Sequence, residues 1–356
     1  MKKLFLPLLV AAIACSPDQS KTGSAATADN QTSGSVDLTG AGATFPAPIY
    51  SKWFADYATK TGVKINYQAI GSGGGIRQLS EGTVDFGASD SPMKDEEIAK
   101  AKGPVYHIPT VLGAVAVTYN LPAVSTQLKL TGEVVADIFA GKITKWNDGR
   151  IAALNSGVKL PATDILVVHR SDGSGTTFVF TDYLTTVSKT WAAGPGRGKE
   201  VPWPVGLGGK GNDGVAGQVK QTPGGVGYVE LAYAKQNNLT FASIKNAAGN
   251  FVEPSVAGAT AAAAGVAEKL PPNTDYRLSI VNAAGADAYP ISSFTWILVY
   301  QNQTDAVKAK KLNDFLRWAL TDGEAEAAAL FYAPIPPTMA TQLLQRLDSI
   351  KVGTTK

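Results

Sequence analysis

Short apolar segments alternate with amphipathic segments along the chain from about residue 38 to the C-terminus. Strands are predicted where short runs are rich in β-branched and aromatic residues, at 63–70, 84–89, 114–120, 164–169 and 294–301. Helices are predicted where apolar residues recur at helical spacing, at 49–62, 75–82, 132–142, 176–191, 309–323 and 339–350. Segments 227–237 and 256–269 are expected to be helical in part. Because strands and helices alternate, the pattern predicts an α/β fold with largely parallel sheets.

Length and composition narrow the class of protein. A chain of 356 residues favours two domains over one. The residues are 44% hydrophobic and 17% charged, and the formal net charge is +3 from 32 basic and 29 acidic residues. No basic face or tail stands out, so nucleic acid is not expected as a partner.

The N-terminus has the pattern of an export signal. Lys2 and Lys3 precede an apolar stretch, which is too short to span a bilayer, so residues 1–14 are predicted to be a signal peptide. The one cysteine, Cys15, follows directly, as in the bacterial lipoprotein signal, where the cysteine becomes the lipidated first residue. Ala12 departs from that pattern, because leucine is commonest there, and a free cysteine in an ordinary signal peptide is the alternative.

The next segment is expected to connect this anchor to the folded protein. Residues 15–37 are small and polar and lack periodicity, which predicts a flexible tether after the lipidated Cys15. The expected location is the cell envelope, in the periplasm, with attachment to a membrane through the lipid only. With no second cysteine in the chain, disulfide bonds are not expected.

Three glycine-rich stretches have the same chemical character. Each carries a small hydroxyl residue and opens a predicted helix: GAGATFPAP (40–48), GSGGGIRQ (71–78) and RSDGSGTTF (170–178). The unpaired N–H groups of a helix N-terminus bind anions. Ser, Thr and Gly also cap helices where no ligand binds. Each stretch taken alone therefore leaves both interpretations open.

Nucleotide, metal and nucleophile motifs are not found. GLGGKGND (206–213) lacks both the first glycine of a phosphate loop and the Ser or Thr that should follow its lysine. The two histidines, His107 and His169, do not have zinc-site spacing. Ser174 does not lie in a G-x-S-x-G motif. We therefore expect no cofactor, no metal and no enzymatic activity.

Six blocks together resemble the periplasmic phosphate-binding protein of bacterial ABC phosphate importers. They occur in that family's order and at similar spacings: TGAGATFPAPIYSKW, GSGGGIRQL, VDFGASDSPM, RSDGSGTTFVFTDYL, WPVGLGGKGNDGV and PGGVGYVELAYAKQNNL. The resemblance extends from about Leu38 to near Tyr300 and more loosely to the end. Residues 251–288 follow no motif of that family.

The resemblance implies the two-lobed periplasmic-binding-protein fold of type II, with a mixed, mostly parallel sheet in each lobe, flanking helices and a two-strand hinge. Lobe 1 would combine residues 38–116 with 292–356, and lobe 2 would be residues 117–291. Such lobes close around a ligand held between them. The implied partners are inorganic phosphate and the permease subunits of an ABC transporter, and a monomer is expected.

The resemblance also implies a set of phosphate-binding residues. Carried over position by position, they are Thr44, Phe45, Ser72, Asp90, Arg170, Ser174, Gly175 and Thr176. The planar guanidinium of Arg170 suits an oxyanion, and the other groups supply hydroxyl and backbone donors. Asp172 is expected to hold Arg170 in place, to cap a helix, or both. His169 and Ser171, which flank Arg170, are not expected to touch the ligand.

Asp90 bears on the choice of ligand. A carboxylate repels an anion unless that anion carries a proton for it to accept. Phosphate has a P–OH group near neutral pH and sulfate has none, so Asp90 predicts selection of phosphate. The alternatives are a receptor for sulfate, molybdate or another oxyanion, and a secreted phosphatase on the same scaffold. A phosphatase would need a metal cluster or an activated nucleophile, and it would turn over a phosphoester.

Overall fold

The computed structural model describes residues 38–267, 270–271 and 274–353, which all belong to one compact unit. The predicted signal peptide, the tether and Cys15 lie outside the described residues. Within the described part, no helix is both long and apolar enough to cross a bilayer. The same residues contain no group of three or more His, Cys, Asp or Glu side chains that could hold a metal ion.

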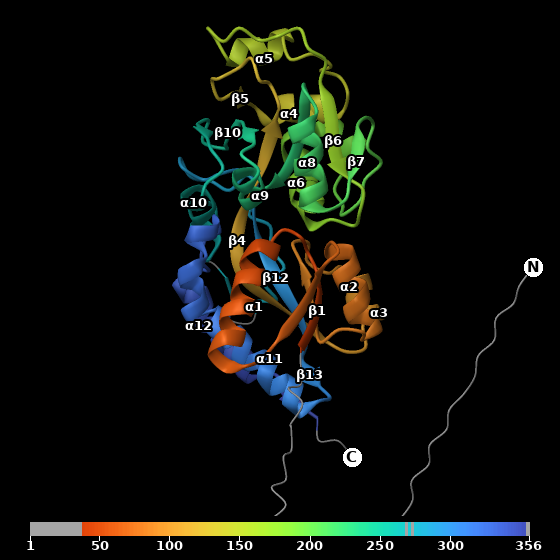
Figure 1. Ribbon diagram of the computed structural model, residues 1–356, viewed down its shortest axis with the longest axis vertical. Coiled ribbons are helices and arrows are strands. Elements are labelled where there is room, and N and C mark those ends of the chain that lie inside the picture. Colours follow the sequence, from red (N-terminus) through yellow and green to blue (C-terminus); the bar gives the residue numbers. More distant parts are fainter. Residues whose placement is uncertain (1–37, 268–269, 272–273, 354–356) are drawn as a thin grey trace, which may run out of the picture. The chain divides into compact units, whose positions relative to one another are not determined.

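A mixed nine-stranded sheet organises these residues, with the strand order β2-β1-β3-β12-β4-β8-β6-β7 and β9 beside β4 (Figure 1). Pairing is parallel in β2-β1-β3 and in β8-β6-β7, and antiparallel around β12 and β4. The bounds are β1 Leu38–Gly42, β2 Ile65–Ala69, β3 Phe86–Ser89, β4 Val105–Tyr119, β6 Leu166–Arg170, β7 Leu207–Gly209, β8 Gly225–Glu230, β9 Thr240–Phe241 and β12 Ser292–Tyr300.

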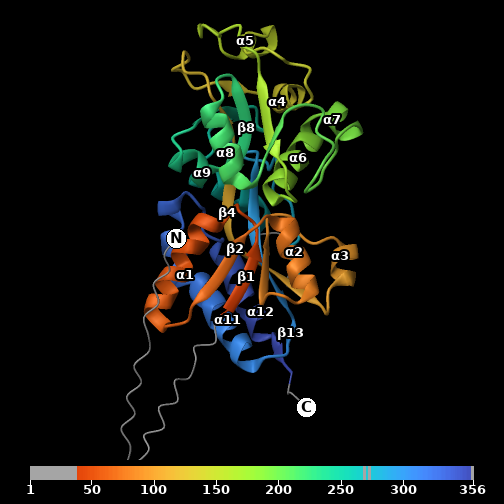
Figure 2. The ribbon, with the colours of Figure 1, turned by 45° about the vertical axis from the view of Figure 1, so that its right-hand side comes forward.

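Helices accompany the two parallel parts of the sheet (Figures 1 and 2). We call the elements around β1, β2 and β3 lobe 1 and those around β6, β7 and β8 lobe 2. The helices of lobe 1 are α1 Ala47–Thr61, α2 Ser72–Glu81, α3 Asp95–Lys100, α11 Ala306–Ala319 and α12 Pro337–Asp348. Those of lobe 2 are α4 Gly132–Phe139, α5 Gly149–Leu154, α6 Gly175–Val187, α7 Lys189–Ala193, α8 Gly211–Gln221 and α9 Leu231–Gln236.

The smaller elements lie outside the main sheet. A three-stranded sheet has the order β11-β10-β5, and β13 pairs with β14. The bounds are β5 Lys129–Leu130, β10 Ser243–Lys245, β11 Phe251–Val252, β13 Asn302–Gln303, β14 Lys351–Val352, α10 Val256–Ala267, and the 3₁₀ helices η1 Asp322–Glu326 and η2 Ala328–Leu330.

Strand β4 is shared by both lobes. Nine of its first ten residues, Val105–Ala114, pair with β12, with Thr110 left unpaired at a bulge, and the next five pair with β8. The sequence predicted only its C-terminal part, because Pro109 lacks an N–H group and is unfavourable in a central strand. Pro109 is accommodated at a bulge, where the register opposite Thr295 and Trp296 shifts.

Helix α1 shows how the core of lobe 1 fixes the turn that follows β1. Its apolar face is buried, and Phe54 packs against Phe315 of α11 with ring centroids 5.3 Å apart. The indole N–H of Trp53 donates to the Gly323 carbonyl at 2.8 Å. The helix ends at Gly62, whose φ of 76° is the left-handed conformation that favours glycine. These contacts fix α1 against the core of lobe 1.

The described residues of the segment 251–288, which matched no family motif, contact both lobes. Ser279 donates to Asp182 of α6 at 2.6 Å, and Arg277 pairs with Asp95 of α3, also at 2.6 Å. The amide of Asn246 donates to carbonyl groups of residues 285, 286 and 288. The segment therefore packs along both lobes as part of the folded unit.

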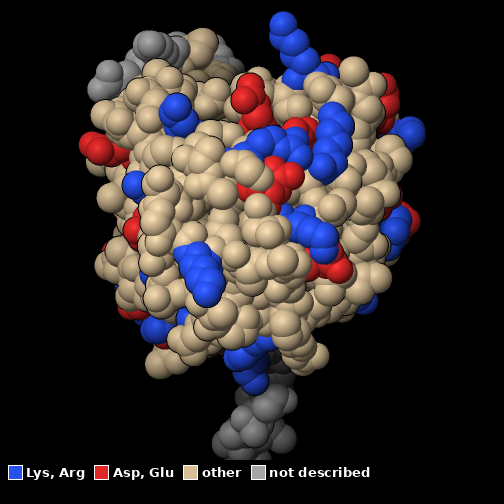
Figure 3. Space-filling view, turned by 90° about the horizontal axis from the view of Figure 1, so that it is seen from above, with Lys and Arg blue, Asp and Glu red and all other residues tan. Residues whose placement is uncertain are grey.

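Surface charge is mixed at the end of the molecule that carries α5. Figure 3 shows basic and acidic side chains interspersed there on a largely uncharged surface. Two ion pairs near α5 are typical, Lys145 with Asp164 at 2.6 Å and Arg150 with Asp148 at 3.0 Å. This face gathers no large area of one sign.

Candidate anion-binding site

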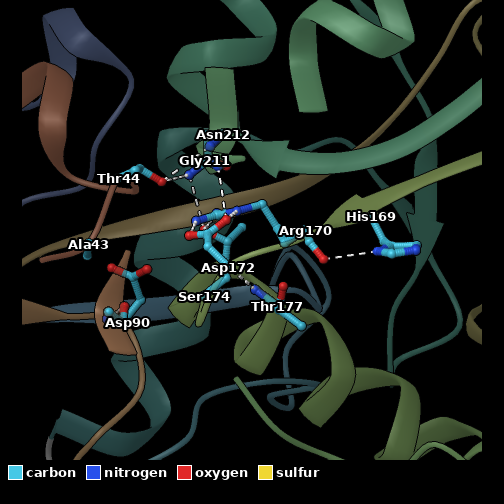
Figure 4. A network of polar contacts seen from close by, with 12 residues as sticks. Ala43, Thr44, Asp90, His169, Arg170, Asp172, Ser174, Thr177, Gly211 and Asn212 are labelled. Atoms are coloured by element: carbon cyan, nitrogen blue, oxygen red, sulfur yellow. Dashed lines mark hydrogen bonds and ion pairs between the residues drawn. The ribbon is translucent and has the colours of Figure 1, made fainter. Parts of the chain in front are cut away.

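The three glycine-rich turns meet where lobe 1 faces lobe 2. The first leads from β1 into α1, the second from β2 into α2, and the third from β6 into α6. The N–H of Gly73 in the second turn donates to the Gly173 carbonyl of the third at 2.8 Å. Thr44 of the first turn is bonded to Asn212 of α8 (Figure 4). The N-terminal ends of three long helices therefore border one region.

Arg170 ends strand β6 and is fixed by Asp172. Its side chain is only 1% exposed, and its Nε and Nη2 donate to the two Asp172 carboxylate oxygens at 2.8 and 2.6 Å (Figure 4). Burial alone would raise the pKa of Asp172. The bidentate ion pair and the Gly211 N–H, at 3.0 Å, outweigh burial and hold that pKa below its usual value. The bidentate ion pair therefore holds the Arg170 guanidinium in one plane.

Aromatic residues brace the strand that carries Arg170. His169 stacks on Trp203 with ring centroids 4.8 Å apart and planes 9° apart. The Tyr228 hydroxyl accepts from the Arg170 backbone N–H at 3.1 Å and shares a 2.7 Å hydrogen bond with the Thr177 hydroxyl. His169 therefore supports the strand, which explains an aromatic residue directly before the arginine.

Asp90 follows strand β3 and is 1% exposed. Its Oδ1 accepts from the Thr295 hydroxyl at 2.8 Å, and its backbone N–H donates to Ser72 Oγ at 3.2 Å. Burial raises the pKa of Asp90 to about 7. The hydrogen bond from Thr295, the positive charge of Arg170 and the hydrogen bond from Ser72 each lower that pKa, but by less than burial raises it. Near neutral pH this carboxyl group can therefore either accept or donate a proton.

Two glycines allow the lobes to approach each other this closely. A Cβ atom on Gly175 would lie 2.4 Å from Ser72 Oγ and 2.5 Å from Asp90 Oδ2. A Cβ on Gly71, whose φ is 89°, would lie 2.4 Å from Asp172 Oδ2. Both contacts join lobe 1 to lobe 2, so any side chain at either position would hold the lobes apart.

Donor groups surround the same region. Thr44 and Thr176 are buried with their hydroxyls on either side of Asn212. Ser174 Oγ caps α6 by accepting from the Thr177 N–H at 3.0 Å, so its hydroxyl hydrogen is still available to a ligand. The backbone N–H groups of Phe45, Gly175 and Thr176 are among those that have no acceptor within the described part of the chain.

The structure brings all eight predicted site residues into this one region, with Asp172 beside them. Sequence reasoning missed Asn212 and Thr295. Asn212 lies inside one of the six blocks quoted above, but an asparagine at the start of a helix is usually a cap. Thr295 lies in an apolar strand, where nothing in the sequence marks it. Their roles follow only from the tertiary contacts.

Comparisons with known proteins show the family of this chain. Residues 21–323 match the family model of the PBP superfamily domain. The phosphate-binding protein PstS of Pasteurella multocida is 48% identical over 84% of this chain and 86% of its own length. The chain belongs to the PstS family. PstS of Xylella fastidiosa (strain Temecula1) is 46% identical over 87% of this chain and 84% of its own. PstS of Methanocaldococcus jannaschii is 39% identical over 92% of this chain and 90% of its own length.

Solved structures confirm the fold predicted for this PstS-family chain. The phosphate-binding protein of Stenotrophomonas maltophilia is 21% identical and superimposes with a TM-score of 0.67, over 87% of this chain and 93% of that one. A high-affinity periplasmic phosphate-binding protein, PfluDING, solved with phosphate at pH 8.5, is 22% identical with a TM-score of 0.67. It covers 86% of this chain, and 92% of its own length is matched. The two-lobed α/β architecture is therefore shared.

Proposed function

We propose that this PstS-family protein binds inorganic phosphate between its two lobes and delivers it to the permease of an ABC phosphate importer. One observation carries the proposal. A buried arginine, held by its own aspartate, faces a buried carboxyl group that titrates near neutral pH, among the N-termini of three helices. This arrangement suits a small anion that itself carries a proton.

The donors account for the cost of removing phosphate from water. A desolvated anion must exchange its hydration shell for well-aimed hydrogen bonds. Arg170 supplies a full positive charge, and the helix N-termini supply partial positive charge through their N–H groups. Thr44, Ser72, Ser174 and Thr176 supply hydroxyls. The N–H groups of Phe45, Gly175 and Thr176 are the backbone donors.

Asp90 selects the ligand. As a carboxylate it accepts a hydrogen bond from the P–OH group of phosphate. It faces sulfate with no hydrogen between two negatively charged oxygens. A receptor for sulfate or molybdate is therefore disfavoured, because the site would bury a repulsive carboxylate against such an anion. A pKa of about 7 makes this selection strongest above neutral pH.

Binding is coupled to closure of the lobes. In our proposal the lobes comprise residues 38–116 with 292–356, and residues 117–291. The chain crosses between them in β4 and again just before β12. Contacts such as Gly73 with Gly173 form only when the lobes meet. Phosphate therefore stabilises the closed form, because it binds groups of both lobes at once.

The N-terminal residues determine the cellular location in our proposal. We propose that residues 1–14 direct export, that Cys15 becomes lipidated, and that residues 15–37 tether the lobes to a membrane of the envelope. The protein then works in the periplasm as a monomer, with the lipid as its only membrane attachment and without enzymatic activity.

A calorimetric titration of the purified protein with phosphate and then with sulfate tests the proposed function. At about pH 8 we expect saturable binding of one phosphate per chain and no measurable heat from sulfate at the same concentration. Equal affinities for the two anions would refute selection by Asp90, and no phosphate binding would refute the function itself. Incubation with a chromogenic phosphoester distinguishes a phosphatase, which would release phosphate.

A further inference from the structure

Asn212 has no role in the binding scheme above, yet its side chain joins the two lobes. It lies at the start of α8 and is fully buried. Its Oδ1 accepts the backbone N–H of Glu230 at 2.9 Å. Its Nδ2 donates to Thr44 Oγ1 at 2.8 Å and to Thr176 Oγ1 at 3.1 Å (Figure 4 shows the Thr44 side). Because the Glu230 N–H only donates, it fixes which end of the amide faces the two threonines.

The two threonine hydroxyls are saturated as acceptors. A hydroxyl oxygen has two acceptor positions and one hydrogen. Thr44 Oγ1 accepts from Asn212 Nδ2 and also from the Asn212 backbone N–H at 3.3 Å. Thr176 Oγ1 accepts from Asn212 Nδ2 and from Arg170 Nη1 at 3.3 Å. Neither hydroxyl donates a hydrogen bond to any residue in the described part of the chain, so its hydrogen is the group left for a ligand.

We propose that Asn212 is a positioning residue that makes the Thr44 and Thr176 hydroxyls obligate donors to bound phosphate. The inference rests on the proposed function and extends it. An obligate donor tolerates only an unprotonated oxygen. The P–OH group of phosphate is therefore excluded from both threonines and directed to Asp90. Because one amide serves a threonine of each lobe, this orientation is complete only when the lobes are closed.

A double-mutant cycle on phosphate affinity tests the inference. Asn212→Ala frees both hydroxyls to turn, and we expect phosphate affinity to fall about 10- to 100-fold. In the Thr44→Val/Thr176→Val background, where no hydroxyl remains to be oriented, the same change should cost less than about threefold. A merely structural asparagine would reduce affinity equally in both backgrounds.

Asn212→Asp reverses the direction of the hydrogen bonds and keeps the shape. The new carboxylate still accepts the Glu230 N–H, but it also accepts from both threonine hydroxyls, whose hydrogens then turn away from the phosphate. We expect a larger loss than for Asn212→Ala, about 100-fold or more, part of it from the added negative charge. In the Thr44→Val/Thr176→Val background only the effect of the added charge should remain, so Asn212→Asp should reduce phosphate affinity by a smaller factor. If Asn212→Ala does not fold, the cycle is run with Asn212→Asp alone.

Asn155→Ala is the matched control. Asn155 is a buried asparagine of lobe 2 whose amide bonds the backbone of Lys129 and Ile151. We expect this change to lower the melting temperature and leave phosphate affinity unchanged. An undiminished Asn212 effect in the valine background, or no effect of Asn212→Ala in the parent, would overturn the inference while phosphate binding by the parent stands. Failure of the parent to bind phosphate would refute the proposed function instead.

Discussion

Gly175→Ala should separate phosphate affinity from folding stability. The glycine begins helix α6 in lobe 2 and has an ordinary helical conformation, so alanine is compatible with its backbone. An added Cβ would lie 2.4 Å from Ser72 Oγ, 2.5 Å from Asp90 Oδ2 and 2.7 Å from Asp90 Cβ. All three atoms belong to lobe 1. The clash therefore arises only when the lobes close.

The size of the effect follows from this overlap. Contacts under 3.0 Å with buried atoms force the neighbours to move, and overpacking of this kind costs about 1–3 kcal/mol. That cost is paid in the closed state and corresponds to about a 5- to 150-fold loss of phosphate affinity. Alanine is a better helix former than glycine by about 0.5–1 kcal/mol in a helix interior. The ligand-free variant should therefore be as stable as the parent, or slightly more stable.

Calorimetric titration measures the phosphate affinity, and thermal unfolding of the ligand-free protein measures the folding stability. Gly217→Ala is the matched control, because it makes the same change in α8 of the same lobe, where a Cβ would meet no atom within 4 Å. We expect parent-like phosphate affinity from Gly217→Ala and weakened affinity from Gly175→Ala. Parent-like affinity in Gly175→Ala would show that the lobes do not close as tightly on phosphate as the structure implies.

Four further predictions follow from the site and the N-terminus. Arg170→Ala should weaken phosphate binding by about two to four decades in calorimetry with an unchanged circular dichroism spectrum, because the buried phosphate would lose its positively charged partner, at a cost of about 3–5 kcal/mol. Asp90→Asn should raise sulfate affinity relative to phosphate, since an amide can donate to a sulfate oxygen. In the parent, sulfate binding should rise up to about tenfold per pH unit below pH 7, where the raised pKa of Asp90 lets the carboxyl group gain a proton and donate it. Cys15→Ser should release the protein from the membrane fraction, with loss of acyl mass in mass spectrometry.

Each of these has a contradicting result. Parent-like phosphate affinity in Arg170→Ala would make that residue a structural arginine. An unchanged phosphate-to-sulfate ratio in Asp90→Asn would assign selectivity to cavity shape or to the donors around Arg170. Sulfate binding that is flat with pH in the parent, or equally pH-dependent in Asp90→Asn, would show that another group titrates. A mature chain that starts elsewhere than Cys15 would exclude the lipid anchor.

The local features of the site could be predicted from the sequence, because they depend on short segments. Glycine and hydroxyl residues followed by a helical pattern mark a helix N-terminus, and α1, α2 and α6 each begin within three residues of the predicted start. The strand β1 before the first of these turns was not predicted. Whether the N-termini of three helices meet depends on the order of the strands in the sheet. The hydrophobic periodicity of the sequence does not predict that order. The family resemblance supplied that step, and the residues that it indicated converge.

The remaining features depend on contacts between distant segments. Thr295 bonds Asp90 across 205 residues, and Asn212 bonds Thr44 across 168. The pKa of Asp90 comes from its burial between strands, which no local pattern records. The shared strand β4 was predicted too short because Pro109 is tolerated only at a bulge opposite β12. Tertiary packing decides each of these.

A crystal structure of the protein grown with phosphate at about pH 8 tests the central claim most directly. We predict one phosphate between the lobes, with one oxygen about 2.5–2.7 Å from an Asp90 carboxylate oxygen, the length of a charge-assisted O–H···O bond. Other phosphate oxygens should lie within hydrogen-bonding distance of Arg170 Nη1 and of the Thr44 and Thr176 hydroxyls. Phosphate bound elsewhere, or an Asp90 side chain turned away from it, would contradict the account.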